Sequence, residues 1–280
     1  MAEDLMKKGE GKIGRIFFND PEGAYECFNK AGAAFKADAN FNRAGDAYMR
    51  AGDLAVKLEN TADACNAYTE CAKMYSRSNM DKAQTAIKMA VQINIDNSRL
   101  GNAARLLMNW GEQNESAGNT EAAIAAYKRA CELFYAEDQK SSMNQCKLKI
   151  ANLLAMSKMW AEAAKMYEDI GMMYAEGPTK TMAKNPFFNS FICRVAAVPP
   201  ENRMEGSAEL GDVLERIENY DPYYKNTREH DVSQMLVEGM QDENEEKIDE
   251  AIRMMDSFRM LDDLKTRALN CVKDSFENAN

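Results

Sequence analysis

A chain of 280 residues with 45% hydrophobic residues can bury a large core, and its length allows one or two domains. The formal net charge of −10 argues against nucleic acid as the main partner, because DNA and RNA are themselves polyanions. No segment reaches the roughly 18 apolar residues of a membrane-spanning helix, and the first residues lack the apolar region of a signal peptide. We therefore expect a cytosolic protein.

Residues 1–19 form a separate amino-terminal segment. Its first part has the composition of a short helix, which we expect Gly9, Gly11 and Gly14 to break. The loop that follows carries two adjacent rings, Phe17 and Phe18, beside basic residues. These rings either dock onto the next helices or insert shallowly into a membrane interface, where rings are buried and cations meet anionic lipid.

Between residues 20 and 178 one pattern returns every 19 to 21 residues. A large residue is usually preceded by a small one four positions earlier and followed by a small or apolar one three positions later. Steps of four and three place all three residues on one face of an α-helix. The large residues are Phe28, Tyr48, Tyr68, Ile87, Leu107, Tyr127, Leu148 and Tyr167.

This spacing predicts a right-handed solenoid of helical hairpins over residues 20–178, and an all-α protein. An interval of about 20 residues holds one helix and a short turn, so a hairpin repeats every 40 residues or so, as in tetratricopeptide-like arrays. Each small residue provides the hole that a ring of the neighbouring helix enters. The turns are expected at 38–40, 59–61, 78–79, 96–98, 117–119 and 137–139.

The repeating pattern of small and large residues ends at Gly177-Pro178, and residues 179–280 are predicted to form an acidic helical bundle. We expect the apolar residues Phe187, Phe188, Phe191 and Ile192 to seal the last hydrophobic face of the array. Helical patterns resume at 207–219, 227–241, 245–258 and 261–276. This part holds 21 Asp or Glu and 13 Lys or Arg, a net charge of −8.

The residue types that catalysis needs are sparse. The only histidine, His230, is expected on the surface, and no metal cluster or nucleotide fingerprint occurs in the sequence. Carboxylates at 245–250 occupy the predicted outer face of a helix, which is a solvated surface rather than a catalytic pair. The seven cysteines lack a C-x-x-C pair, so we expect reduced packing residues. We therefore expect neither an enzyme nor a cofactor.

Several strings resemble the soluble NSF attachment proteins, the SNAP family. AYECFNKAGAAFK and AGDAYMRAGDLAVKL are similar to the repeats of that family, and NQCKLKIA resembles its N-K-C-L-L-K-V-A. The similar segments keep their order along nearly the whole chain. They are 24–36, 44–58, 118–135, 144–151, 167–171, 183–188 and 256–262.

The resemblance implies an adaptor that binds assembled SNARE coiled coils through basic residues. Arg99, Arg105 and Lys149 stand where the family has cations. Gln145 replaces a family lysine, and Lys147 supplies a charge two residues later. The adaptor would be a monomer alone and would assemble in several copies on the SNARE bundle, without binding nucleic acid.

The resemblance also implies recruitment of an NSF-type hexameric ATPase through the acidic carboxyl end. Phe17 and Phe18 resemble the membrane-contacting rings of the family, which implies a cytoplasmic protein associated peripherally with membranes. The amino-terminal segment is shorter than in the family, and the acidic tail with a near-terminal leucine is missing. The candidate ATPase-binding residues are Glu238, Asp242, Glu245, Glu246 and Phe276.

Two other interpretations remain open. The chain could be a tetratricopeptide-like scaffold for another helix or peptide, or a diverged SNAP that binds SNAREs without activating the ATPase.

Overall fold

The computed structural model describes residues 1–13 and 19–277, with side chains described through residue 274. All regular secondary structure in the described residues is helical, which confirms the predicted all-α class. The chain divides into two compact units, Met1–Met143 and Asn144–Asn280. This division groups residues by contact and does not test the predicted domain ends at 19 and 178, which stay predictions.

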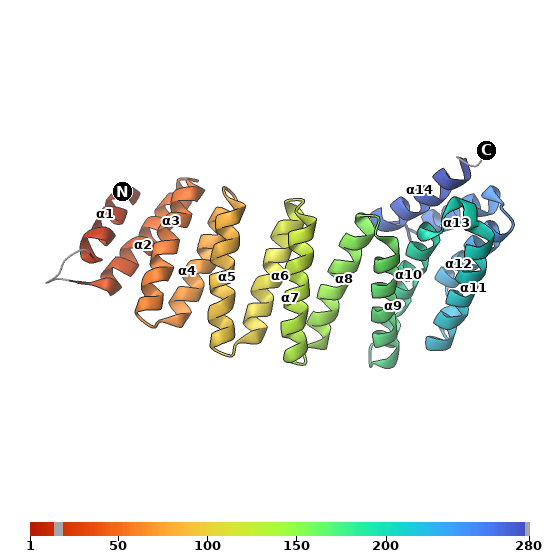
Figure 1. Ribbon diagram of the computed structural model, residues 1–280, viewed down its shortest axis with the longest axis horizontal. Coiled ribbons are helices and arrows are strands. Elements are labelled where there is room, and N and C mark those ends of the chain that lie inside the picture. Colours follow the sequence, from red (N-terminus) through yellow and green to blue (C-terminus); the bar gives the residue numbers. More distant parts are fainter. Residues whose placement is uncertain (14–18, 278–280) are drawn as a thin grey trace. The chain divides into compact units, whose positions relative to one another are not determined.

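In the first unit each helix packs against the helix that follows it in sequence, and the labels of Figure 1 give this order. The helices run antiparallel and are joined by tight connections. They are α1 (Ala2–Ile13), α2 (Pro21–Ala37), α3 (Phe41–Lys57), α4 (Thr61–Tyr75), α5 (Met80–Asp96), α6 (Leu100–Ser116) and α7 (Thr120–Ala136), and α8 (Lys140–Met156) crosses into the second unit.

The connections lie at the predicted turns. In the turn after α2, Ala39 adopts a left-handed conformation with φ of 54°, and Asn40 then caps α3 by accepting a hydrogen bond from the Arg43 amide. Asn60 and Asn79 cap α4 and α5 in the same way. An asparagine side chain satisfies amide groups that the first helical turn leaves without partners. Side-chain caps of this kind therefore begin three successive helices, α3 to α5, whereas Arg99 and Asn119, which precede α6 and α7, make no side-chain cap bond.

Rings pack against glycines of neighbouring helices, as the small-and-large pattern predicted. A Cβ atom on Gly52 would lie 2.6 Å from the Tyr68 ring, and one on Gly32 would lie 2.8 Å from the Tyr48 ring. The Tyr68 hydroxyl also donates a hydrogen bond to Oδ1 of Asp53 at 2.8 Å. The absence of a side chain thus lets each ring approach the helix backbone closely.

The amino-terminal helix differs from the prediction. Gly9 and Gly11 do not break it, because α1 continues to Ile13, and Gly14 lies outside the described residues. A Cβ atom on Gly9 would meet the Phe28 ring at 2.9 Å. Gly9 therefore allows α1 to pack closely on α2, and this contact outweighs the low helix propensity of glycine.

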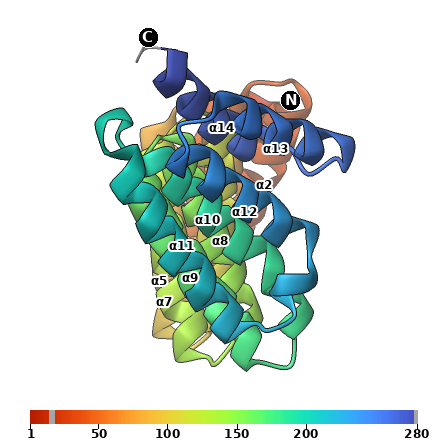
Figure 2. The same ribbon diagram turned by 90° about the vertical axis from the view of Figure 1, so that its right-hand side faces the viewer.

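The second unit is built around α10 (Lys184–Ala197), which contacts α9, α11, α12 and α14. Figure 2 shows these helices from the carboxyl-terminal side. Their bounds are α9 (Trp160–Glu176), α11 (Arg203–Tyr220), α12 (Arg228–Gln241), α13 (Glu245–Ser257) and α14 (Asp263–Glu277). Short 3-10 turns lie between them at η1 (Lys180–Met182), η2 (Pro200–Asn202) and η3 (Tyr224–Asn226).

The sequence pattern did not predict α10 as a helix. Its apolar residues point in several directions because helices pack on more than one side of it, so they do not form a single stripe. Phe187 is fully buried, and its ring lies against Gly171 of α9, where a Cβ atom would be 2.5 Å away. The predicted covering of the α9 face by these rings is therefore present.

The cysteines serve packing. Cys27, Cys71, Cys146 and Cys193 are buried, and the other three are partly buried. Burial raises the pKa of the Cys71 and Cys193 thiols to about 12, so both stay protonated at neutral pH.

Candidate functional site

The candidate SNARE-binding cations of the first unit lie on α6. Arg99 is the exposed residue before this helix, and Arg105 is exposed two turns later, where its guanidinium donates a hydrogen bond to Asn102. One turn beyond Arg105, Asn109 lines a groove of about 540 Å³ between α4 and α6. Lys73 of α4 lines its other side. An exposed cation thus lies beside a mixed polar and apolar groove, which suits a charged helical partner.

The candidate cations of the second unit lie on α8. Lys147 is half-buried, and its Nζ atom lies 3.5 Å from the Met173 sulfur of α9. Lys149 follows two residues later, which places the two side chains about 160° apart around the helix. The structure therefore does not bring these lysines to one face of α8. Assigning both to a SNARE-binding surface stays a prediction.

The candidate ATPase-binding carboxylates meet at the corner between α12 and α13, which we call the acidic corner. Glu238 lies in the last turn of α12, and Asp242 is the residue that follows this helix. Glu245 and Glu246 lie in the first turn of α13. Lys247 lies among them, with Nζ 2.8 Å from Oδ2 of Asp242 and 3.5 Å from Oε2 of Glu238. The hydrogen bond that Lys247 donates to Asp242 is the main cause of the raised pKa of Lys247.

The two halves of the acidic corner differ in their partners. Lys247 neutralises Glu238 and Asp242 in part, whereas Glu245 and Glu246 form no ion pair with any described residue. Both of the latter lie in the first turn of α13. The carboxylates most available to a basic partner are therefore Glu245 and Glu246.

The side chains of three further candidate residues are not among those that the structure describes. Phe17 and Phe18 lie outside the described residues, and the side chain of Phe276 does too. Their predicted membrane and ATPase contacts stay predictions.

An ionic cluster that the sequence pattern did not reveal joins three helices of the second unit. Glu168 of α9 is buried, and its two carboxylate oxygens accept hydrogen bonds from Arg194 of α10 and from Arg216 of α11. The Arg216 Nε atom lies 2.7 Å from Oε1. Burial alone would raise the pKa of this carboxyl, but the two guanidinium groups outweigh it and lower the pKa.

His230 was predicted on the surface, and this prediction is wrong. The His230 side chain is only 8% exposed, and its Nε2 atom lies 2.8 Å from Oε1 of Glu218 on α11. Thr227 caps α12 by accepting a hydrogen bond from the His230 amide, which fixes the start of the helix and turns His230 toward α11. Burial would raise the pKa of Glu218, yet hydrogen bonds from His230 and Lys225 lower it.

The described residues offer little chemistry of other kinds. They contain no group of three or more His, Cys, Asp or Glu side chains placed to hold a metal ion. No helix among them combines the length and the apolar character that crossing a bilayer requires.

Comparison with known proteins bears on the whole chain. The family model described as "Soluble NSF attachment protein, SNAP" matches residues 1–277. The chain is 26% identical to the alpha-soluble NSF attachment protein of Vitis vinifera, with 99% of this chain and 94% of the relative aligned. It is 28% identical to the beta-soluble NSF attachment protein of Bos taurus, over 99% and 91% of the two chains.

A fungal relative agrees with these two. The vesicular-fusion protein SEC17 of Komagataella phaffii is 24% identical, with 99% of this chain and 96% of the relative aligned. Identity is low, but each alignment covers nearly both chains in full, so the resemblance drawn from the repeat strings is confirmed. The chain belongs to the soluble NSF attachment protein family.

Proposed function

We propose that this protein is a non-catalytic adaptor that binds SNARE coiled-coil complexes and recruits an NSF-type hexameric ATPase to disassemble them. The observation that carries the proposal is the family match over residues 1–277. The protein would act in the cytoplasm and contact membranes peripherally, with Phe17 and Phe18 as the candidate membrane residues.

The charge distribution supports two different contacts. The exposed arginines before and on α6 are suited to the acidic surface of a SNARE bundle, and either lysine of α8 can add a contact from its own side of that helix. The acidic corner is suited to a basic surface of the ATPase. Each exposed ion pair contributes at most about 1 kcal/mol, so several pairs and several adaptor copies on one bundle are needed for stable binding.

Recruitment tests the proposal directly. A preassembled SNARE bundle is immobilised, and retention of the ATPase is measured with and without this protein in the presence of non-hydrolysable ATP. The proposal expects ATPase on the bundle only when the protein is present. Retention of the protein without the ATPase would identify a SNAP that binds SNAREs but recruits nothing, and no retention of the protein would refute the proposal.

A further inference from the structure

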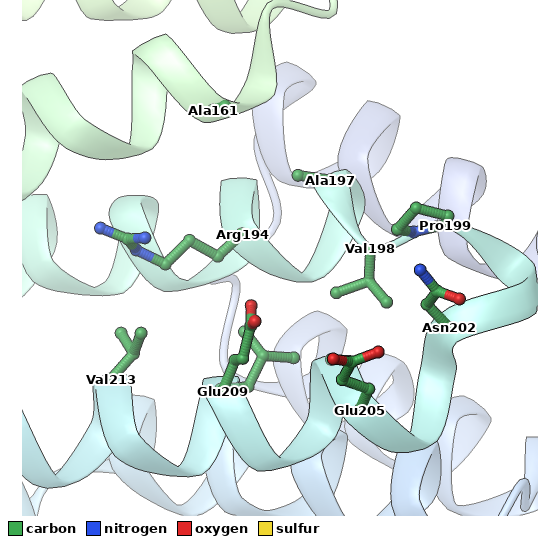
Figure 3. Close-up of a pocket in the computed structure, with 11 residues that line it drawn as sticks. Ala161, Arg194, Ala197, Val198, Pro199, Asn202, Glu205, Glu209 and Val213 are labelled. Atoms are coloured by element: carbon green, nitrogen blue, oxygen red, sulfur yellow. The ribbon is translucent and has the colours of Figure 1, made fainter.

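A groove in the second unit is lined by none of the residues assigned above to a partner. It has a volume of about 330 Å³ and lies between the end of α10 and the first half of α11. Its floor is apolar, with Val198, Leu210 and Val213 among the lining residues. In Figure 3 the Val198 side chain points into the space between the two helices. Such a floor accepts methylene and methyl groups.

The rim of this groove is negative. Figure 3 shows the carboxylates of Glu205 and Glu209 rising from α11 toward α10. Both residues are exposed, and neither carboxylate has an ion-pair partner among the described residues. The one cation that lines the groove is Arg194, and its guanidinium is engaged by Glu168. A ligand therefore meets two carboxylates that lack a counter-ion.

The negative charge continues along α11 beyond the groove. Glu205, Glu209 and Asp212 follow each other at steps of four and three, so they lie on one exposed stripe of the helix. This stripe extends over about 10 Å of helix. A short amine would reach only part of it, whereas a helix lying along α11 could place one cation opposite each carboxylate.

We propose that the α10–α11 groove binds a basic amphipathic helix of a partner protein. Apolar side chains of that helix would enter the groove over Val198, and lysines or arginines one turn apart would pair with Glu205 and Glu209. The site shares no lining residue with the candidate SNARE-binding cations or with the acidic corner. It does not depend on the proposed adaptor function, since it rests only on the shape and charge of the groove.

The test uses the full chain alone and a synthetic probe. The probe is a fluorescent helical peptide with lysines at positions i, i+4 and i+7 beside a row of leucines, and its affinity is measured by anisotropy at low salt. A peptide with glutamates in place of the lysines is the first control. The proposal predicts binding of the lysine peptide only, with protection of the Val198–Val213 segment in hydrogen exchange.

Variants then locate the site. Replacing both groove carboxylates, Glu205→Gln with Glu209→Gln, is expected to weaken peptide binding about fivefold to tenfold, as the loss of two exposed pairs implies. Ala197→Lys, at an exposed position of the groove wall, is expected to weaken it as well by supplying a competing cation. The matched control, Asp38→Asn with Glu59→Gln, removes the same charge from exposed turns of the first unit.

Each outcome decides the proposal. Weaker binding in the two groove variants, with unchanged binding in the control, supports it. Equal losses in the groove and control variants would mean that net charge alone attracts the peptide, which overturns it. A long-chain aliphatic diamine that binds as tightly as the peptide, and loses affinity in the same groove variants, would make the ligand a small amine and also overturn it.

Discussion

The Nζ atom of Lys247 lies 2.8 Å from Oδ2 of Asp242, so a lysine occupies the centre of the corner that is the candidate contact for a basic ATPase surface. An arriving cation would compete with this lysine for Asp242 and for Glu238. We therefore predict that Lys247→Gln tightens ATPase binding about twofold to fivefold, in line with the modest energy of exposed pairs.

Titration of the ATPase onto the adaptor–SNARE complex measures this effect. The matched control is Lys30→Gln, which removes a lysine that pairs with Glu26 on α2. Glu245→Gln with Glu246→Gln should weaken binding more than Glu238→Gln with Asp242→Gln, because Lys247 already neutralises the second pair in part. Equal effects of the two double variants would contradict this division of the corner.

The SNARE-facing cations give a second prediction. Arg105→Glu combined with Lys149→Glu should reduce SNARE binding at least tenfold, because two attractive contacts become repulsive. The affinity of the unaltered protein should also fall steeply with salt. Surface plasmon resonance on an immobilised SNARE bundle measures both quantities.

A matched charge reversal elsewhere in the chain distinguishes the effect of these two residues from the effect of the net charge. Lys30→Glu with Arg129→Glu changes exposed cations of α2 and α7 that pair with neighbours on their own helices. This control should keep most of its affinity. If it loses as much as the variant with Arg105→Glu and Lys149→Glu, the proposed SNARE-binding residues are wrong.

The Glu168 cluster provides a stability prediction. Glu168→Gln leaves Arg194 and Arg216 without their shared carboxylate, and we expect it to lower the free energy of unfolding by about 2 kcal/mol, less than for a fully buried pair because both arginines are partly exposed. Unfolding in guanidinium chloride, followed by tryptophan fluorescence, measures this free energy, since Trp160 lies on α9. The control Glu26→Gln removes an exposed ion pair with Lys30 and should change the free energy of unfolding by less than about 0.5 kcal/mol.

The lowered pKa of Glu168 makes this effect depend on pH. The pKa is lower in the folded state than in the unfolded chain, where a glutamate titrates near 4.3, so the stabilisation is complete above about pH 4.3 and is lost as the pH falls through the folded-state value. The stability difference between the unaltered protein and Glu168→Gln should shrink between pH 7 and pH 3. A difference that stays constant over this range would show that charge is not its cause.

Because rings pack on some glycines and not on others, replacing glycine by alanine is predicted to change the stability in opposite directions at Gly52 and at Gly11. Gly52→Ala would place a Cβ atom 2.6 Å from the Tyr68 ring, and we expect a loss of about 1–3 kcal/mol from overpacking. Gly11→Ala meets no atom within 4 Å and lies inside α1, so it should stabilise by about 0.5–1 kcal/mol. Thermal unfolding of both variants checks this, and a stabilising Gly52→Ala would contradict the packing account.

The repeats were predictable because they depend on local rules. The steps of four and three around Tyr48 and Tyr68 define one helix face, and the turns before α3, α4 and α5 carry asparagines that cap the next helix. Both signals lie within a single helix and its connection. The order of the helices and the packing of rings on glycines follow from them.

The errors concern contacts between distant residues. Glu168 resembles a surface glutamate until α10 and α11 bring arginines to it from 26 and 48 residues away. His230 is buried by α11, and Gly9 is held in α1 by the Phe28 ring. Local propensity contains no information about such neighbours. The candidate binding residues came from family resemblance, and the distribution of charge around Lys247 became visible only in the structure.

The proposed function requires this protein to couple SNARE complexes to an ATPase. The most direct measurement mixes the purified protein with a fluorescently labelled, preassembled SNARE bundle and an NSF-type ATPase, and follows bundle disassembly after addition of ATP. The account predicts disassembly that requires both the protein and ATP hydrolysis. A bundle that stays assembled, under conditions in which a known SNAP supports its disassembly, would contradict it.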